Sequence, residues 1–97
     1  MQSSMDLTTF KAELAQDGYT EIDTRTIEPN LFNPAHSHPF HVRAQMLEGE
    51  LTLSWEGTQR TFRPGEIFTM AAGCEHTEWF GAAGAKYIVG RKAASAT

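Results

Sequence analysis

Two short segments of this 97-residue chain contain all four of its histidines. The first segment holds His36, His38 and His41, and the second ends at His76. Residues at positions i and i+2 of an extended strand point to the same face, so His36 and His38 can present two imidazoles together. Neutral imidazole is the commonest protein ligand for first-row transition metals. If a returning strand brings His76 beside them, the three nitrogens form a metal site.

The elements that must position these histidines begin with a short helix. Asp6 is a suitable N-cap for a helix over residues 7–16, and Gly18 is a natural stop. The apolar residues recur at helical spacing, at Leu7, Phe10 and Leu14. With so few apolar positions, the helix is expected to pack on the outside of the remaining structure.

From Tyr19 onward the pattern changes to short segments rich in threonine, isoleucine and aromatic residues, separated by glycine and proline turns. This spacing predicts roughly seven or eight strands in an all-β sandwich or small barrel. The chain is expected to form a single domain over 1–97, with a barrel core over about 19–92. Turns or loops are expected at 48–50, 56–58, 64–65, 72–73 and 81–84.

Composition and charge narrow the class of partner. The net charge is −4 and the chain has no basic run, which argues against nucleic acid. No apolar run is long enough to span a bilayer, and the first residues do not have the pattern of a signal peptide. Cys74 is the only cysteine, so no intrachain disulfide can form, and a cytoplasmic location is expected. A small molecule is the expected partner.

The two histidine segments resemble the two motifs of the cupin superfamily, whose members are small double-stranded β-helix (jelly-roll) barrels. His36 and His38 match the His-x-His of the first motif, and Gly49 matches its closing glycine. In the second motif the family pattern places two glycines and a histidine where this chain has Gly65, Gly73 and His76. The resemblance covers about residues 30–90 and implies a small single-domain bacterial cupin of the RmlC-like kind. Ala71 and Phe80 depart from the proline and asparagine of that second motif.

The most important departure concerns the carboxylate ligand. The glutamate of the first motif falls at Val42, which cannot bind a metal. By alternation Val42, Ala44 and Met46 share one face, expected to be the inner one. With Phe80 they are the expected walls of a substrate-binding pocket.

The resemblance implies that His36, His38 and His76 bind a divalent transition metal, which could be zinc, iron, nickel, manganese or copper. Two residues could provide a fourth ligand. His41 could replace the missing glutamate, or it could lie on the outer face of the barrel. Glu78, two residues after His76, could contribute a carboxylate or act as a base, or it could be a solvated strand residue.

Two functions remain open at this point. The first is a metal-binding cupin that holds a small molecule in an apolar barrel pocket, with oxygenase- or isomerase-type chemistry. The alternative is a non-catalytic sensor module that binds a small molecule without metal-dependent activity. A metal-free epimerase is less favoured, because Tyr19 and Tyr87 are the only tyrosines available as an acid. The resemblance also implies a homodimer, with residues 19–31 available for pairing.

Overall fold

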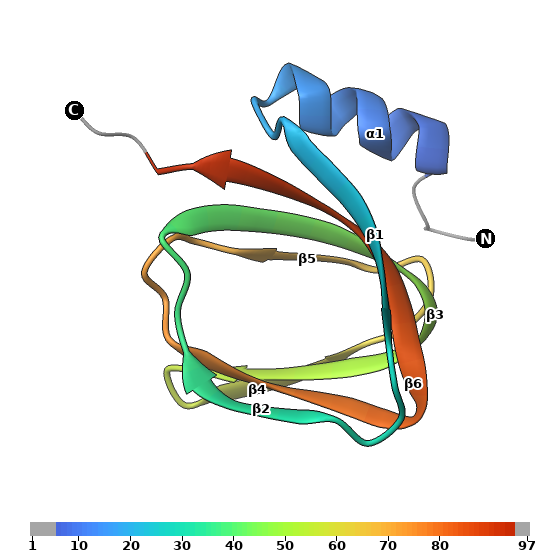
Figure 1. Cartoon of the computed structure of the whole chain (residues 1–97), viewed down its shortest axis with the longest axis vertical. Coiled ribbons are helices and arrows are strands. Elements are labelled where there is room, and N and C mark those ends of the chain that lie inside the picture. The colour runs from blue at the N-terminus through green and yellow to red at the C-terminus, as the bar shows by residue number, and fades with distance from the viewer. Residues whose placement is uncertain (1–5, 95–97) are drawn as a thin grey trace.

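The computed structural model describes residues 6–94, which contain one helix and six strands. The remainder of the expected single domain, residues 1–5 and 95–97, lies outside the described residues. Figure 1 shows the strands arranged as a ring, with the helix packed against the outside. The elements are α1 (Leu7–Gln16), β1 (Glu21–Ile27), β2 (Phe32–His36), β3 (Phe40–Trp55), β4 (Thr58–Phe62), β5 (Ile67–Met70) and β6 (His76–Ala93).

Two long strands, β3 and β6, connect the two halves of the barrel. They pair with each other in antiparallel fashion along most of their lengths. In one half β1 pairs with the second part of β6, and β5 pairs with the first part of β3. In the other half β2 pairs with the first part of β6, and β4 pairs with the last part of β3. The prediction of an all-β barrel with a short N-terminal helix is therefore confirmed.

Two of the predicted turns are wrong. Residues 48–50 were expected to separate two strands, but they lie inside the continuous strand β3. Residues 81–84 were expected to form a flexible loop, but they lie inside β6. Both segments depart from regular pairing, because the register between the strands shifts on each side of Gly49. The glycines that suggested turns therefore mark the places where two long strands bend together.

The bend changes which side chains face the interior. Leu51 pairs with Phe80 and Gly49 pairs with Ala85, so two steps along β3 correspond to five steps along β6. The three additional residues on β6 are an odd number, and side chains alternate faces with a period of two. Even-numbered residues of β6 consequently face inward before the bend, and odd-numbered residues face inward after it.

The main core fills the interior of the barrel. Its buried residues come from β3, β4, β5 and β6, so burial of apolar surface holds both halves together. The inward face predicted for the first part of β3 is confirmed, because two of its members are fully buried there. The core residues are Ala44, Met46, Leu51, Leu53, Phe62, Phe68, Met70, Phe80, Ala85, Tyr87 and Val89.

The helix covers the outer face of the barrel through a second, smaller core. Phe10 and Leu14 are fully buried against Ile88 of β6. The predicted N-cap is present, because the Asp6 carboxylate accepts a hydrogen bond of 3.2 Å from the Thr9 amide. No helix among residues 6–94 is both long enough and apolar enough to cross a bilayer.

Ion pairs also join the helix to the barrel. The Arg43 guanidinium on β3 lies 3.3 Å from an Asp17 carboxylate oxygen and 3.7 Å from one of Glu13. The Arg43 side chain is directed toward the helix and therefore does not occupy the inward face of β3. The apolar residues next to Arg43 on β3 occupy that face. The homodimer expected from the resemblance stays a prediction, which sedimentation can test.

The bend in the two long strands provides a stability test. Gly49 has φ +77°, and a Cβ atom there would collide with the Gly84 carbonyl oxygen. We expect Gly49→Ala to lower the free energy of unfolding by about 2–5 kcal/mol, from backbone strain and from overpacking. Gly57 in the β3–β4 turn also has φ +77°, but a Cβ atom added there would have no other atom within 4 Å.

Gly57→Ala is therefore a matched control that reports backbone strain alone, expected to cost about 1–2 kcal/mol. Urea titration followed by tryptophan fluorescence would measure both variants. Equal losses of stability would contradict a specific role for the contact between Gly49 and Gly84.

Candidate functional site

Strand pairing brings the two histidine segments together. Strands β2 and β6 are antiparallel, and His36 is the register partner of His76. Side chains directly opposite each other on neighbouring strands lie on the same face. The two imidazole centroids are accordingly 4.5 Å apart. These two histidines are 40 positions apart in the sequence but are direct neighbours in the fold.

His38 joins this pair from the loop between β2 and β3. The Gly73 amide donates a hydrogen bond of 2.9 Å to the His38 carbonyl, which ties this loop to the turn before β6. The His38 ring lies 4.9 Å from His36 and 5.4 Å from His76, measured between centroids. On its other side it stacks on Phe40, with centroids 5.0 Å apart and an angle of 17° between the rings.

Glu78 brings a carboxylate to the three histidines. Its Oε2 lies 3.5 Å from His76 Nε2, and its Oε1 lies 3.9 Å from His36 Nε2. The Asn33 side-chain amide on β2 donates a hydrogen bond of 2.8 Å to Glu78 Oε1 and fixes the carboxylate. One potential ligand atom from each residue lies within 4.8 Å of all the others. We call His36, His38, His76 and Glu78 the His/Glu cluster.

Backbone carbonyls determine which nitrogen of two imidazoles is free. His36 Nδ1 lies 2.8 Å from the Pro34 carbonyl, and His76 Nδ1 lies 3.0 Å from the Cys74 carbonyl. A carbonyl oxygen can only accept, so each Nδ1 must carry the proton. In the neutral rings the lone pair is then on Nε2, the atom that faces Glu78. Hydrogen bonds of this kind orient the histidine ligands of metal sites.

Electrostatics favour the neutral form of the third imidazole. Burial lowers the pKa of His38 below its usual value, and the neighbouring His36 and His76 lower it further. The Glu78 carboxylate acts in the opposite direction and Arg91 lowers the pKa again, but the net direction is downward. Neutral imidazole is the form that can bind a metal.

A cavity of about 310 Å³ opens beside the His/Glu cluster, and we call it the barrel pocket. Two of the four predicted pocket residues, Val42 and Phe80, line it. The other two, Ala44 and Met46, are fully buried in the core and are not among its lining residues. The full lining is Arg25, Ile27, Leu31, Asn33, His36, His38, Phe40, Val42, Phe68, Glu78, Phe80, Tyr87, Val89 and Arg91.

His41 lies outside the His/Glu cluster. Its Nδ1 accepts a hydrogen bond of 2.9 Å from the Ala72 amide, in the turn between β5 and β6. This contact gives His41 a local role in holding the turn, which lies next to the Gly73 amide that binds the His38 loop. Of the two proposed fourth ligands, the structure brings Glu78, and not His41, into the group with the three histidines.

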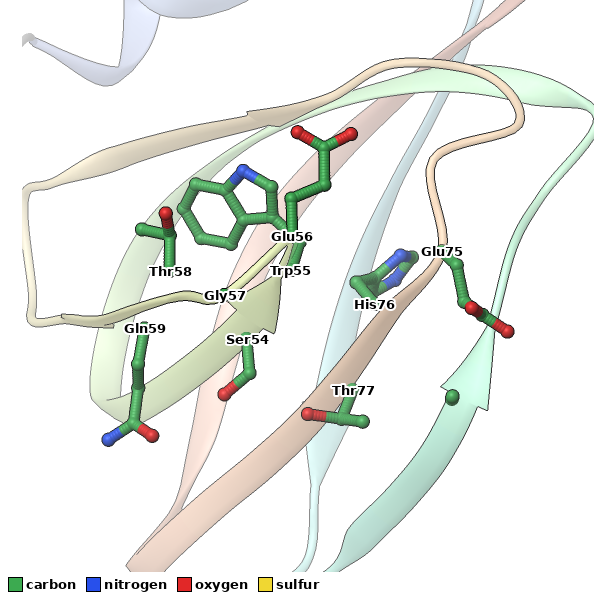
Figure 2. Close-up of a pocket in the computed structure, with 10 residues that line it drawn as sticks. Ser54, Trp55, Glu56, Gly57, Thr58, Gln59, Glu75, His76 and Thr77 are labelled. Carbon is green, nitrogen blue, oxygen red and sulfur yellow. The ribbon is translucent and has the colours of Figure 1, made fainter.

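A second cavity, of about 400 Å³, lies on the other side of His76 (Figure 2). The β3–β4 turn and the start of β6 form its walls, which include Trp55, Glu56 and Thr77. His76 is the only member of the His/Glu cluster that lines it. His76 is only 3% exposed although it lines this outer cavity.

The sequence analysis did not identify several residues of the barrel pocket, and three of them carry a charge or a hydroxyl group. Arg25 on β1 and Tyr87 on β6 are register partners, and Arg91 lies four residues further along β6. Burial raises the pKa of Tyr87, with a further rise from Glu78, so its hydroxyl keeps its proton near neutral pH. The alternation of Tyr87, Val89 and Arg91 could have indicated a shared face, but only the bend shows that this face is the inner one.

No family model matches this sequence, and no curated protein matches it. Solved structures do match. A protein of unknown function from Rhizobium leguminosarum superposes with a TM-score of 0.72 at 21% identity, covering 96% of this chain and 100% of that one. A cupin-2 domain protein from Shewanella frigidimarina superposes with a TM-score of 0.60 at 19% identity, covering 70% of this chain and 65% of that one.

The DMSP lyase DddQ from Ruegeria pomeroyi superposes with a TM-score of 0.67 at 22% identity. The match covers 78% of this chain but only 39% of that enzyme, so this chain corresponds to less than half of it. At these identities the likeness shows the fold. The resemblance to the cupin superfamily is confirmed at that level, and the chain has the cupin fold.

The hydrogen bond between Ala72 and His41 provides a second stability test. We expect His41→Ala to lower the free energy of unfolding by about 0.5–1.5 kcal/mol, because the Ala72 amide loses its acceptor. The exposed Thr69 on the neighbouring strand β5 is the control, and Thr69→Ala is expected to stay within about 0.5 kcal/mol. A loss no larger than that of the control, in urea titrations, would show that this bond contributes nothing to stability.

Proposed function

We propose that this chain, which has the cupin fold, binds a divalent transition metal through the His/Glu cluster and holds a small molecule in the barrel pocket beside it. One observation carries the proposal. Two imidazoles direct their Nε2 atoms toward the Glu78 carboxylate, and one potential ligand atom from each of the four side chains lies within 4.8 Å of all the others. A divalent cation between these atoms would be bound by the imidazole nitrogens and the carboxylate oxygen together.

The dimensions of the cluster are compatible with a metal. Two nitrogens bound to one ion at about 2.1 Å can be at most about 4.2 Å apart. The ligand atoms of the cluster lie within 4.8 Å of one another. Side-chain shifts of a few tenths of an ångström would therefore close the site. Three imidazole nitrogens and one carboxylate oxygen suit zinc, iron, nickel, copper or manganese.

The surroundings support a role in binding or chemistry. A bound divalent metal would act as a Lewis acid toward an oxygen atom of the small molecule. Asn33 fixes the Glu78 carboxylate, and the walls of the barrel pocket include the apolar side chains of Phe68 and Phe80. The protonated Tyr87 hydroxyl is available as a hydrogen-bond donor. Oxygenase- or isomerase-type chemistry is consistent with this arrangement, and the fold's use by a DMSP lyase supports an enzymatic function.

The apolar walls of the barrel pocket also favour a second candidate function, a non-catalytic module that senses a small molecule. In such a module the His/Glu cluster would have only a structural role, and ligand binding would not depend on metal. Comparing ligand affinities of the metal-loaded and metal-free protein separates the two functions. Equal affinities would favour the sensor.

The first test of the proposed function is the metal content of the protein. Protein purified without a nickel column is expected to contain, or to take up, about one equivalent of a divalent transition metal. In His76→Ala and Glu78→Ala the content is expected to fall, because each substitution removes a ligand. Elemental analysis after dialysis against Fe²⁺, Zn²⁺, Ni²⁺ or Mn²⁺ would measure it.

His41→Ala is the matched control, because His41 lies outside the His/Glu cluster and should not affect metal content. Less than about a tenth of an equivalent in the unmodified protein, with no uptake of any of the four metals, would refute the metal site. A loss of metal in His41→Ala equal to that in His76→Ala would refute this choice of ligands.

The second test of the proposed function concerns Asn33, which positions the Glu78 carboxylate without being a metal ligand. We expect Asn33→Ala to weaken metal affinity by about 10–100-fold, which is typical when a residue that orients a ligand is removed. Competition with a chromophoric chelator would measure the affinity. An unchanged metal affinity in a folded variant would mean either that Glu78 binds the metal without being oriented by Asn33, or that Glu78 does not bind the metal.

A further inference from the structure

Two arginines face the barrel pocket from the neighbouring strands β1 and β6. Within residues 6–94, neither Arg25 nor Arg91 has a carboxylate oxygen within 4.0 Å. By contrast, Arg43 and Arg63 each have such a partner. Glu21 is the register partner of Arg91 on β1, yet the two do not form an ion pair. Among the described residues, the pocket thus has two guanidinium groups without a carboxylate partner, of which Arg25 is exposed and Arg91 is half-buried.

Aromatic stacking connects one of these arginines to the His/Glu cluster. The Arg91 guanidinium carbon lies 5.5 Å from the centroid of the Phe40 ring, a cation–π distance. The same Phe40 ring also stacks on the His38 imidazole, with ring centroids 5.0 Å apart. A single aromatic ring therefore touches both a potential metal ligand and a guanidinium. This contact restricts Arg91 and holds it near the cluster.

The second arginine is adjacent to the buried tyrosine. Arg25 is the register partner of Tyr87, so their side chains leave the same face of the β1–β6 pair. Both guanidinium groups are close enough to Tyr87 to act on the charge of its hydroxyl. Arg25, Arg91 and the Tyr87 hydroxyl form a group of hydrogen-bond donors on the β1 and β6 wall.

The charges that line the barrel pocket favour an anion. Its lining contains two arginines and one carboxylate, Glu78. A divalent metal on the His/Glu cluster would add two further positive charges. Most of the remaining wall is apolar, with Phe68, Phe80 and Val42 among its members. A ligand that matches these surfaces has a compact anionic group and an apolar body.

We propose that the barrel pocket binds a small organic acid, whose carboxylate is held by Arg25 and Arg91 while its apolar body lies between them and the His/Glu cluster. This inference rests on the proposed function and names its substrate class. The guanidinium fork matches a carboxylate in a bidentate manner. The same fork also matches a phosphate, so inorganic phosphate is included in the test as the competing anion.

The test compares acids with uncharged molecules of the same shape. Benzoate and butanoate, together with benzamide and butanamide, would be titrated into the Zn²⁺-loaded protein by calorimetry or by NMR chemical shifts. Each acid is expected to bind at least about tenfold more tightly than its amide, as a charge-assisted hydrogen bond would provide. Arg25→Gln and Arg91→Gln are expected to remove that preference and to leave metal content unchanged.

Arg60→Gln is the matched control. Arg60 is exposed on β4, does not line the barrel pocket, and like the other two has no carboxylate partner within residues 6–94. This variant should keep the full preference for the acid. Arg91→Lys retains the charge but not the fork, so it should keep only part of the preference if Arg91 binds in a bidentate manner.

Three results would overturn the inference: equal binding of acid and amide, an undiminished preference in both glutamine variants, or tighter binding of inorganic phosphate than of either acid. Metal content measured on the same samples separates the two proposals. A full equivalent of Zn²⁺ without preference for the acids refutes the organic acid and leaves the metal site standing. An arginine-dependent preference in protein that binds no metal refutes the metal site and supports the arginine site.

Discussion

The bend shared by β3 and β6 is the constraint on which the rest of the barrel depends. At this point Gly49 packs directly against the backbone of Gly84, with no room for a Cβ atom. Both strands continue through the bend, so each belongs to both halves of the barrel. The three additional residues on β6 reverse the alternation of side chains, which sends Glu78 and Phe80 inward on one side and Tyr87 and Val89 inward on the other. One interior results, with apolar residues from both halves and a pocket that reaches the His/Glu cluster.

The His/Glu cluster is organised by main-chain contacts more than by contacts between side chains. Register places His36 opposite His76, and the Gly73 amide ties the loop that carries His38 to the turn before β6. Two carbonyls then orient the His36 and His76 rings so that their Nε2 atoms point at Glu78. Preorganisation of this kind lowers the cost of binding, because the ligands need not search for their orientation. The convergence of three imidazoles and one carboxylate in this orientation is the physical basis for proposing a metal.

The polar groups of the barrel pocket lie in two places with apolar surface between them. The His/Glu cluster is formed by β2, β6 and the loop after β2, whereas the two arginines are on β1 and the end of β6. Phe40 contacts both groups, since it stacks on His38 and lies under Arg91. In the proposed complex this separation would give the small molecule two anchors and thereby one orientation. The lining of the barrel pocket contains two arginines and one carboxylate, in contrast to the net charge of −4 of the whole chain.

The sequence by itself determined the fold class, the helix over residues 7–16, the inward apolar face of the first part of β3 and the three histidines. These follow from short-range rules, namely capping, alternation and the offsets of the glycines and histidines in two motifs. From the sequence, the fourth member of the cluster could be either His41 or Glu78. The glycines of the bend were predicted to lie in turns, and that prediction was wrong. Only the tertiary structure decided these points, because they depend on register across strands that are distant in sequence. A shift of an odd number of residues reverses every later side chain of a strand, and no local pattern in residues 81–84 reveals its size. For the same reason Arg25 and Arg91 could be recognised as pocket residues only after β1 and β6 had been paired.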